Sequence, residues 1–334
     1  MKVSVFGSKP YDREFLDAAN GGRHELHYLD CRLTVATTAL AKGSSAVCLF
    51  ANDRANATTI TAFDHMGIRL IALRSAGFNN VDLNAAAEHH ITVARVPAYS
   101  PHAVAEHTFA LILALVRKIA RAYNRVREGN FSLEGLLGFD LFGKTIGIVG
   151  VGNIGSVVAQ IARGFGLSVL AFDPVRRPEC EAAGVSYVPL EELLERSDIV
   201  TLHCPLNESS RHLVNSDALA RMCKGAILIN TSRGAVVDTH AVIQALKTQQ
   251  LGGLAIDVYE EEEGLFFEDR SEEVIMDDQF VRLMTFPNVV ITGHQGFFTV
   301  EALHNIAETT IANLDAFEAT GKPVHEISAE LASA

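Results

Sequence analysis

This 334-residue sequence lacks an excess of positive charge. It carries 28 Lys and Arg against 40 Asp and Glu, a formal net charge of −12. Nucleic acids are repelled by such a chain, so we expect no nucleic-acid partner. An anionic small substrate is compatible with this charge only where a local arginine or lysine holds it.

Paired cysteines and long apolar runs are also missing. The five cysteines are scattered, with no C-x-x-C pair, which is typical of free thiols in a reducing compartment. The most apolar helical run, 108–116, is far short of a membrane span, and the apolar stretch at 3–6 is too short for a signal peptide. We therefore expect a cytoplasmic protein with no membrane partner. The histidines show no tight spacing with Cys or carboxylates, so no metal is expected.

Ample apolar material is present, at 48% of the residues with 20% charged. At this length, two globular domains are expected. In the first hundred residues, strand patterns at Lys2 to Phe6, Ala46 to Phe50 and Leu70 to Leu73 alternate with helical stretches such as Asn56 to Met66. Such alternation predicts a parallel sheet with crossover helices.

One long helix is predicted next. Ser100 can cap it, Pro101 suits its first turn, and Gly129 follows its expected end near Glu128. Its length exceeds that of the usual globular helix. Such a helix can connect domains or pack against a second subunit. It can equally be an ordinary core helix, and the pattern does not decide between these two interpretations.

A second strand–helix series begins at Lys144. Its length suits a doubly wound dinucleotide-binding domain. The predicted strands are Thr145 to Val149, Ser168 to Phe172, Ile199 to His203, Ala226 to Asn230, Gly253 to Asp257 and Val289 to Thr292.

The first strand of this series runs into a G-x-G-x-x-G turn, GVGNIG at 150–155. The pattern is weak alone, but here it stands between a predicted strand and a predicted helix. Gly150 permits the tight turn, Gly152 lets the backbone approach a pyrophosphate, and Gly155 allows helix and strand to pack closely. The helix N-terminus would add amide donors for phosphates.

An acidic residue, Asp173, ends the next strand. It can accept hydrogen bonds from ribose hydroxyls and would repel a 2′-phosphate, which favours NAD over NADP. Arg176 and Arg177 could weaken that preference, although a solvated basic loop is the simpler interpretation. The alternative for the whole motif is a structural turn in a domain that binds no nucleotide.

Three polar segments follow later strands of the series. Arg233 comes after the strand that ends at Asn230, a run of four glutamates at 260–263 follows the next, and His294 follows the last. Carboxyl ends of parallel strands meet at one edge of the sheet, where ligands bind in open α/β folds. The three residue types can therefore converge near a nicotinamide.

Reduction of a 2-oxo acid by hydride transfer needs these residue types. An arginine can hold the carboxylate and polarise the ketone, a histidine can protonate the nascent alkoxide, and a bonded glutamate would favour the imidazolium. From chemistry alone the alternatives stay open: a structural histidine, a turn-capping arginine, a solvated acidic run and any of its four glutamates.

Several motifs together resemble the D-isomer-specific 2-hydroxyacid dehydrogenase family. They are GVGNIG (150–155), NTSRGAVVD (230–238), DVYE (257–260) and TGHQ (292–295). Further segments are similar to its bacterial fermentative D-lactate branch: RSAGFNNVD (74–82), RVPAYSP (95–101), AEH (105–107), FSLEG (131–135) and LFFED (265–269). The resemblance covers nearly the whole chain.

The resemblance implies a role for particular residues. The catalytic set would be Arg233, Glu262 and His294, with Glu262 selected from the acidic run. Substrate would contact Ser75, Ala76, Gly77, Tyr99, Arg233 and Phe297. NAD would contact Gly150, Gly152, Asn153, Ile154, Gly155, Asp173, Cys204, Pro205, Thr231, Ser232 and Asp257. One departure is Gly296, where the family pattern HQAF has an alanine.

The resemblance also implies the architecture and the activity. The fold class would be α/β, with two doubly wound, Rossmann-like or flavodoxin-like parallel sheets and a cleft that closes between them. Residues 1–100 plus 299–334 would form the substrate domain and 101–298 the NAD-binding domain. A homo-oligomer, dimer or tetramer, would reduce pyruvate to D-lactate. The alternatives are a larger 2-oxo acid of the hydroxyisocaproate type and an NAD-sensing binding module.

Overall fold

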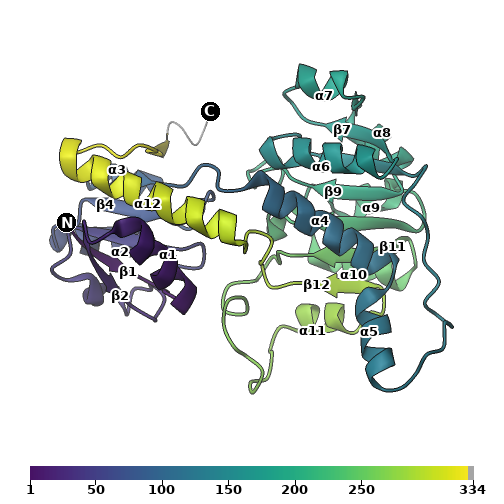
Figure 1. Ribbon diagram of the computed structural model, residues 1–334, viewed down its shortest axis with the longest axis horizontal. Coiled ribbons are helices and arrows are strands. Elements are labelled where there is room, and N and C mark those ends of the chain that lie inside the picture. Colours follow the sequence, from purple (N-terminus) through teal and green to yellow (C-terminus); the bar gives the residue numbers. More distant parts are fainter. Residues whose placement is uncertain (330–334) are drawn as a thin grey trace. The chain divides into compact units, whose positions relative to one another are not determined.

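The computed structural model, which describes residues 1–329, contains two compact units. Unit 1 comprises Met1–Ser100 and the chain from Phe298 onward, and unit 2 comprises Pro101–Phe297. Each unit is built on one parallel sheet with helices beside it (Figure 1). The predicted fold class, two doubly wound parallel sheets, is confirmed. None of the helices among these residues is long and apolar enough to cross a membrane.

Unit 1 has five strands in the order β2-β1-β3-β4-β5, the flavodoxin-like order with its switch point between β1 and β3. The strands are β1 (Lys2–Val5), β2 (Glu25–Tyr28), β3 (Ala46–Leu49), β4 (Leu70–Leu73) and β5 (Thr92–Ala94). The helices are α1 (Pro10–Asn20), the 3₁₀ helix η1 (Thr38–Ala41), α2 (Ala57–His65), α3 (Leu83–Glu88) and α12 (Val300–Thr320). Strands β3 and β4 are buried along their whole length, because helices cover both faces of a parallel sheet.

The carboxyl edge of this sheet is organised by Arg74, which is 2% exposed. Its guanidinium donates to Asp12 Oδ1 at 2.5 Å and to the carbonyl of Phe6 at 2.6 Å. The arginine thus joins the end of β4 to the end of β1 and the first turn of α1. Its packing fixes the start of the loop 75–77 that follows β4.

Unit 2 has seven strands in the order β12-β11-β10-β9-β6-β7-β8. Counted within the unit, this is the Rossmann order with one added edge strand, and the switch point lies between β6 and β9. The strands are β6 (Thr145–Val149), β7 (Ser168–Phe172), β8 (Ser186–Tyr187), β9 (Ile199–Leu202), β10 (Ala226–Asn230), β11 (Leu251–Ile256) and β12 (Val289–Ile291).

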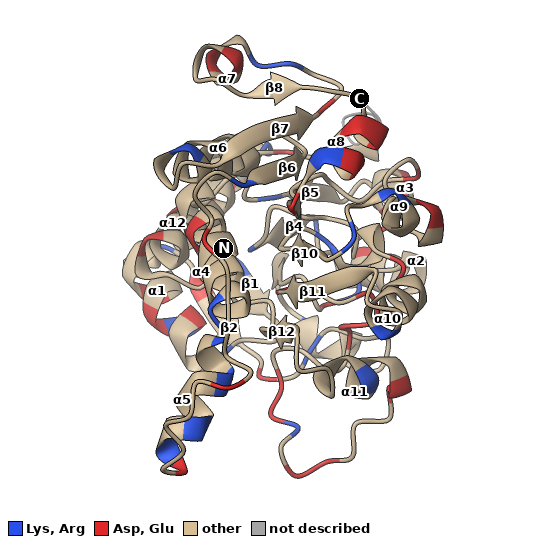
Figure 2. Ribbon diagram, turned by 90° about the vertical axis from the view of Figure 1, so that its right-hand side faces the viewer, with Lys and Arg blue, Asp and Glu red and all other residues tan. Residues whose placement is uncertain are grey.

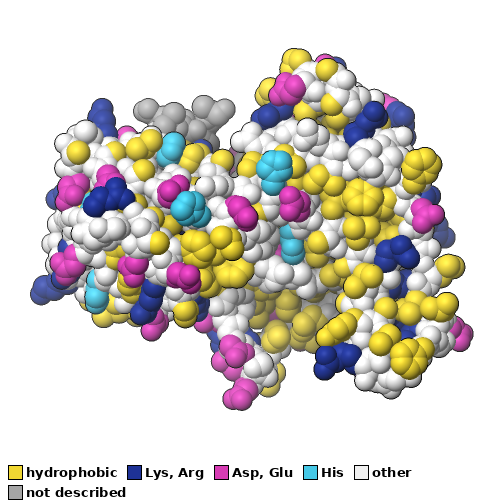
Figure 3. Space-filling view, in the orientation of Figure 1, with side chains coloured by type: hydrophobic (Ala, Val, Ile, Leu, Met, Phe, Trp, Pro, Cys, Tyr) yellow, Lys and Arg dark blue, Asp and Glu magenta, His cyan; other side chains and the backbone are white. Residues whose placement is uncertain are grey.

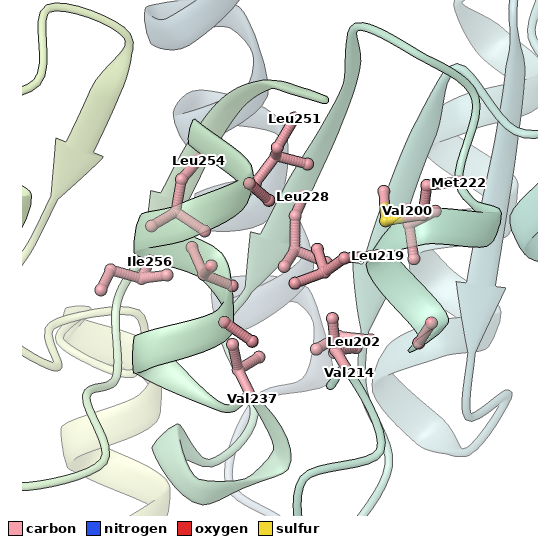
Figure 4. Packing of buried hydrophobic residues seen from close by; sticks show 14 of the residues in the cluster. Val200, Leu202, Val214, Leu219, Met222, Leu228, Val237, Leu251, Leu254 and Ile256 are labelled. Atoms are coloured by element: carbon pink, nitrogen blue, oxygen red, sulfur yellow. The ribbon is translucent and has the colours of Figure 1, made fainter. Parts of the chain in front are cut away.

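Helices cover both faces of this sheet. They are α4 (Pro101–Val116), α5 (Ile119–Arg127), α6 (Asn153–Gly164), α7 (Pro178–Ala182), α8 (Leu190–Arg196), α9 (Ser216–Arg221), the 3₁₀ helix η2 (Gly234–Val236), α10 (Thr239–Lys247) and α11 (Asp278–Met284). On one face, Leu228 and Leu254 pack with residues of α9 and α10 (Figure 4). On the other, Phe109 and Ile112 of α4 pack against Ile148 of β6. The two cores hold the strand ends that carry the polar segments.

The single long helix predicted from Ser100 to Glu128 is wrong. The chain breaks at Lys118, which adopts φ +53, so that α4 ends at Val116 and α5 begins at Ile119. Residues of α4 are buried in the core of unit 2, whereas α5 has no buried residue. The core thus fixes the direction of α4 but not that of α5. The predicted stop signal does end α5, because Gly129, at φ +76, donates its amide to the carbonyl of Val126.

Candidate active site

The turn GVGNIG connects β6 to α6 and lies at the switch point of unit 2. Gly150 has φ +91, and a Cβ there would lie 2.6 Å from the amide nitrogen of Cys204. A Cβ at Gly155 would lie 2.1 Å from the carbonyl oxygen of Gly150. At Gly152, by contrast, a Cβ would meet nothing within 4 Å. The first and third glycines are required by packing, and the second faces open space beside the helix N-terminus.

The N-terminus of α6 has no side-chain cap, since Gly152 is its N-cap residue. Asn153 and Ile154 form its first turn. Asp173, at the end of β7, accepts the amide of Val151 at 2.6 Å and that of Val175 at 2.8 Å. Its carboxylate therefore lies directly beside the glycine-rich turn, with further lone pairs on both oxygens.

The two arginines after Asp173 have local partners. Arg176 lies over the ring of Tyr187 and 3.7 Å from Glu181. Arg177 donates to the side chain of Asn153 at 3.3 Å. These contacts agree with the interpretation of the segment as a surface loop.

The two residues after β9 are partly exposed, and their surroundings favour the uncharged form of each. Burial raises the pKa of the Cys204 thiol to about 11, so this side chain acts as a small apolar group. Burial also lowers the pKa of His203 to about 3. Pro205 accepts the hydroxyl of Ser210 on its carbonyl at 2.6 Å, which closes the loop.

Asn230, the last residue of β10, shapes the turn that carries Arg233. Its Oδ1 accepts the amide and the hydroxyl of Ser232 at 3.0 and 2.9 Å, and its Nδ2 donates to the carbonyl of Arg233 at 2.9 Å. Thr231 is bonded to Thr108 of α4 through their hydroxyls at 3.0 Å. The guanidinium of Arg233 donates to the carbonyl of Ser232 at 2.7 Å.

The turn after β10 is packed against the loop after β11. A Cβ at Gly234 would lie 2.0 Å from the carbonyl carbon of Tyr259 and 2.3 Å from the amide nitrogen of Glu260. Only glycine permits this approach. The two segments that carry Arg233 and Glu262 are therefore in backbone contact.

His294 and Glu262 form a hydrogen-bonded pair. Nδ1 of His294 lies 2.9 Å from Glu262 Oε1, and the second carboxylate oxygen accepts the amide of Tyr259 at 3.0 Å. The two side chains are 18% and 27% exposed. With Nδ1 engaged by the acid, Nε2 is the nitrogen left to face a substrate.

Aromatic rings flank the imidazole of His294. The ring of Phe267 lies 5.5 Å from it and that of Phe297 lies 6.4 Å away, centre to centre. Phe297 is buried. These apolar walls reduce the contact of the pair with water, which strengthens its electrostatic interaction.

Asp257, which follows β11, is 2% exposed and organises the turn that carries His294. Its side chain accepts the Thr292 hydroxyl at 2.5 Å, the Gln295 amide at 2.9 Å and the Gly296 amide at 2.8 Å. Burial alone would raise the pKa of Asp257, but these bonds and one from His107 outweigh it and lower the value. The residue is thus a buried carboxylate within the site.

The other expected substrate contacts lie in unit 1. Ser75 Oγ donates to the carbonyl of Gly77 at 2.8 Å, and Arg95 donates to the carbonyl of Ala76 at 3.1 Å. The carbonyl of Tyr99 accepts from Asn305 of α12. Arg233, Glu262, His294 and Phe297 lie in unit 2.

Sequence reasoning missed three supporting residues: Asn230, Gly234 and His107. The first two stand inside the quoted NTSRG motif, and an asparagine that ends an apolar strand is a usable signal for a turn. His107 ends the quoted AEH segment, but the sequence did not indicate its role, because its partners are 150 and more positions away in the chain.

Comparison with known proteins identifies the family. Residues 109–296 match the family model of the D-isomer specific 2-hydroxyacid dehydrogenase NAD-binding domain. A 2-hydroxyacid dehydrogenase homolog of Haemophilus influenzae is 49% identical over 94% of this chain and 95% of its own length. The D-lactate dehydrogenase of Escherichia coli is 48% identical over 95% of this chain and 97% of its own length.

Among solved structures, the pyruvate reductase of Chlamydomonas reinhardtii superposes with a TM-score of 0.91 at 44% identity. The alignment covers 97% of this chain and 98% of that one. The sequence and the fold of this chain thus match those of known 2-hydroxyacid dehydrogenases. The chain also contains the glycine-rich turn at the switch point, the acid beside it and the histidine–glutamate pair. The chain belongs to the D-isomer specific 2-hydroxyacid dehydrogenase family of NAD-dependent oxidoreductases.

Proposed function

We propose that this protein reduces pyruvate to D-lactate with NADH. The observation that carries the proposal is the His294–Glu262 pair, which lies in the unit that contains the NAD-binding turn. Support comes from the similarity over nearly the full length to proteins described as D-lactate dehydrogenase and pyruvate reductase.

The residues of unit 2 fit NAD. Open space at Gly152, the uncapped N-terminus of α6 and the carboxylate of Asp173 offer room, amide donors and a ribose acceptor. We propose that eleven residues contact the cofactor: Gly150, Gly152, Asn153, Ile154, Gly155, Asp173, Cys204, Pro205, Thr231, Ser232 and Asp257. When bound, NADH supplies a hydride to the ketone carbon.

The chain's own residues hold the substrate and deliver the proton. Arg233 binds the carboxylate and polarises the ketone with its planar donors. His294 gives a proton from Nε2 to the ketone oxygen as the new C–H bond forms, so that pyruvate, NADH and one proton yield lactate and NAD⁺. Glu262 holds the imidazole through Nδ1 and offsets its charge. Ala76 and Gly77 direct amides to the carboxylate, and Tyr99 and Phe297 form walls.

Each unit receives a role in this proposal. Unit 1 is the substrate domain, because it carries Ser75, Ala76, Gly77 and Tyr99. Unit 2 is the NAD-binding domain that the family model matches. We place the protein in the cytoplasm, since its free cysteines are scattered and no described helix could span a membrane. Cell fractionation followed by an antibody against the protein tests the location.

A substrate series tests the reaction. Purified protein is mixed with NADH and pyruvate, 2-oxobutyrate or 4-methyl-2-oxopentanoate, and the loss of NADH absorbance gives kcat/KM for each. The proposal predicts the highest value for pyruvate. A maximum at 4-methyl-2-oxopentanoate indicates a hydroxyisocaproate-type enzyme, with overlap because pockets discriminate only about 10–200-fold per methylene. Tight NADH binding without turnover of any of the three indicates an NAD-sensing module.

We further propose that a second copy of this chain covers the apolar face of α5. Ile119, Tyr123 and Val126 recur on one face of this helix and are 54%, 60% and 53% exposed. The segment after it continues the surface, and its exposed side chains include Phe131, Leu133, Leu137 and Phe142. Figure 3 shows apolar side chains over this part of unit 2, and Figure 2 shows basic residues along α5.

So large an exposed apolar surface marks a contact between proteins. Light scattering on a sizing column gives the mass of the assembly. We expect a dimer or tetramer, and a monomer for the double variant Leu133→Glu, Leu137→Glu. Val274→Glu alters an equally exposed apolar residue outside this surface and serves as the control. A monomeric wild-type chain contradicts the proposal.

A further inference from the structure

A second histidine–carboxylate pair lies directly behind the turn that carries His294. Nε2 of His107, on α4, lies 3.1 Å from Thr292 Oγ1 and 3.3 Å from Asp257 Oδ1. The Thr292 hydroxyl gives its own hydrogen to that same carboxylate oxygen at 2.5 Å. Because this hydrogen is already used, Nε2 of His107 must carry a hydrogen and donate it.

The carboxylate that His107 contacts holds the catalytic turn in place. Asp257 accepts the amides of Gln295 and Gly296 on its side chain, and its backbone carbonyl accepts the amide of His294 at 2.7 Å. His294 itself has φ +54, a left-handed conformation that a residue with a Cβ keeps only where its surroundings enforce it. The position of the imidazole therefore depends on Asp257.

The space around Gly296 also shows that His107 and Asp257 pack closely against the turn. A Cβ at this position would lie 3.0 Å from Asp257 Oδ2 and 3.3 Å from Cδ2 of His107. The glycine that departs from the family pattern is thus the residue against which the His107 ring and the carboxylate pack. Its amide still donates to Asp257 Oδ2 at 2.8 Å.

The neighbour of His107 has a parallel contact. Thr108 of α4 is bonded to Thr231, which begins the turn of Arg233. Consecutive residues of one buried helix thus contact the chain that follows β10, β11 and β12. Since α4 packs against β6 and α6 through the core of unit 2, its position is fixed independently of the site.

We propose that His107 is a positioning residue for the reduction reaction: it acts through Asp257 and Thr292 to hold His294 at the angle that proton donation needs. The inference rests on the proposed function and adds a residue to it. His107 donates to protein groups and takes no part in the transfer itself. A shift of about 1 Å in a catalytic group can cost about 100-fold in rate, so loss of this contact lowers kcat more than it weakens binding.

Two substitutions at His107 differ only in reach. His107→Gln places an amide N–H near the position of Nε2, whereas His107→Asn is one methylene shorter and cannot reach Thr292 and Asp257. We expect His107→Asn to lower kcat about 10–100-fold, with the KM for pyruvate and the Kd for NADH changed less than about threefold. His107→Gln should retain kcat within about threefold of the wild type. Thr292→Val removes the hydroxyl that lies between His107 and Asp257, and it should lower kcat as His107→Asn does.

The experiment measures kcat and KM for the full-length protein, the Kd for NADH from its fluorescence, and Tm. His304→Gln, at an exposed position of α12, is the matched control and should behave as the wild type. The inference is overturned if His107→Asn keeps the wild-type kcat, if Gln and Asn lower it equally, or if kcat falls only in proportion to folded protein. An active wild type with an unaffected His107→Asn variant rejects this inference alone, whereas a wild type that reduces no 2-oxo acid rejects the proposed function as well.

Discussion

Two histidine–carboxylate pairs of unit 2, His294–Glu262 and His107–Asp257, lie at the same turn, and they differ in what surrounds the acid. Glu262 is 27% exposed and accepts from His294 and one backbone amide. The side chain of Asp257 is 3% exposed and accepts from His107, a hydroxyl and two amides. In the proposed reaction the first pair delivers a proton to the substrate, while the second holds a buried carboxylate in place. On this proposal, similar residue types serve proton transfer in one pair and support in the other.

The largest expected effect comes from a double-mutant cycle between the two pairs. His294→Gln removes the proton donor and should lower kcat about 10²–10⁴-fold without weakening NADH binding. If His107 acts only through His294, adding His107→Asn to this variant lowers kcat by less than about twofold more. Steady-state kinetics of the four proteins tests the coupling. Independent, multiplying losses would contradict it.

Removing the buried charge should cost stability in a pH-dependent way. Hydrogen bonds hold the pKa of Asp257 below its usual value, so its carboxylate stabilises the folded state at neutral pH. That stability is lost as pH falls from the unfolded value of about 3.9 through the lower folded value. We expect Asp257→Asn to lower the free energy of unfolding by about 1–3 kcal/mol at pH 7. Urea unfolding at pH 7 and pH 3.5 measures it, and an equal loss at both pH values would argue against this role.

His203, a partly exposed histidine of unit 2, sharpens the comparison, because it bonds a threonine hydroxyl rather than a carboxylate. Burial lowers its pKa to about 3, so below pH 6.5 the unfolded chain binds a proton that the folded protein does not. Folding stability should therefore fall by up to about 1.4 kcal/mol per pH unit between pH 6.5 and 3 on account of this group. In the His203→Gln variant, the free energy of unfolding should fall less steeply between pH 6.5 and pH 3 than in the wild type. Identical slopes for the two proteins would show that His203 is not the group responsible.

The smallest expected effect belongs to Gly296→Ala. The added methyl group requires Asp257 or His107 to move by a few tenths of an ångström. We expect kcat to fall less than about fivefold and the free energy of unfolding to fall less than about 1 kcal/mol. A loss of more than 100-fold in kcat would mean that the turn tolerates no adjustment at all.

Much of this site follows from local sequence. Strand ends such as Asn230 and Asp257 could be located because apolar runs stop there, and parallel strands bring such ends to one edge. The glycine-rich turn could be placed because a strand precedes it and a helix follows. The choice of Glu262 among four neighbouring glutamates needed the family resemblance; its contact with His294 is now part of the structure.

What the sequence could not provide depends on tertiary packing. The break at Lys118 lies inside a continuous helical pattern, and it occurs where the buried α4 leaves the core. The short strands β2, β5 and β8, of two to four residues, owe their pairing to neighbouring strands more than to their own pattern. The link from His107 to Asp257 spans 150 positions and has no local signature.

The handedness of the product tests the central claim most directly. Wild-type protein is incubated with NADH and pyruvate until the NADH absorbance is lost, and the lactate is resolved on a chiral column, with His294→Gln run alongside. The account predicts D-lactate alone, formed at a rate that the variant lowers at least about 100-fold. L-lactate, a racemic product or an equally fast His294→Gln variant would contradict it.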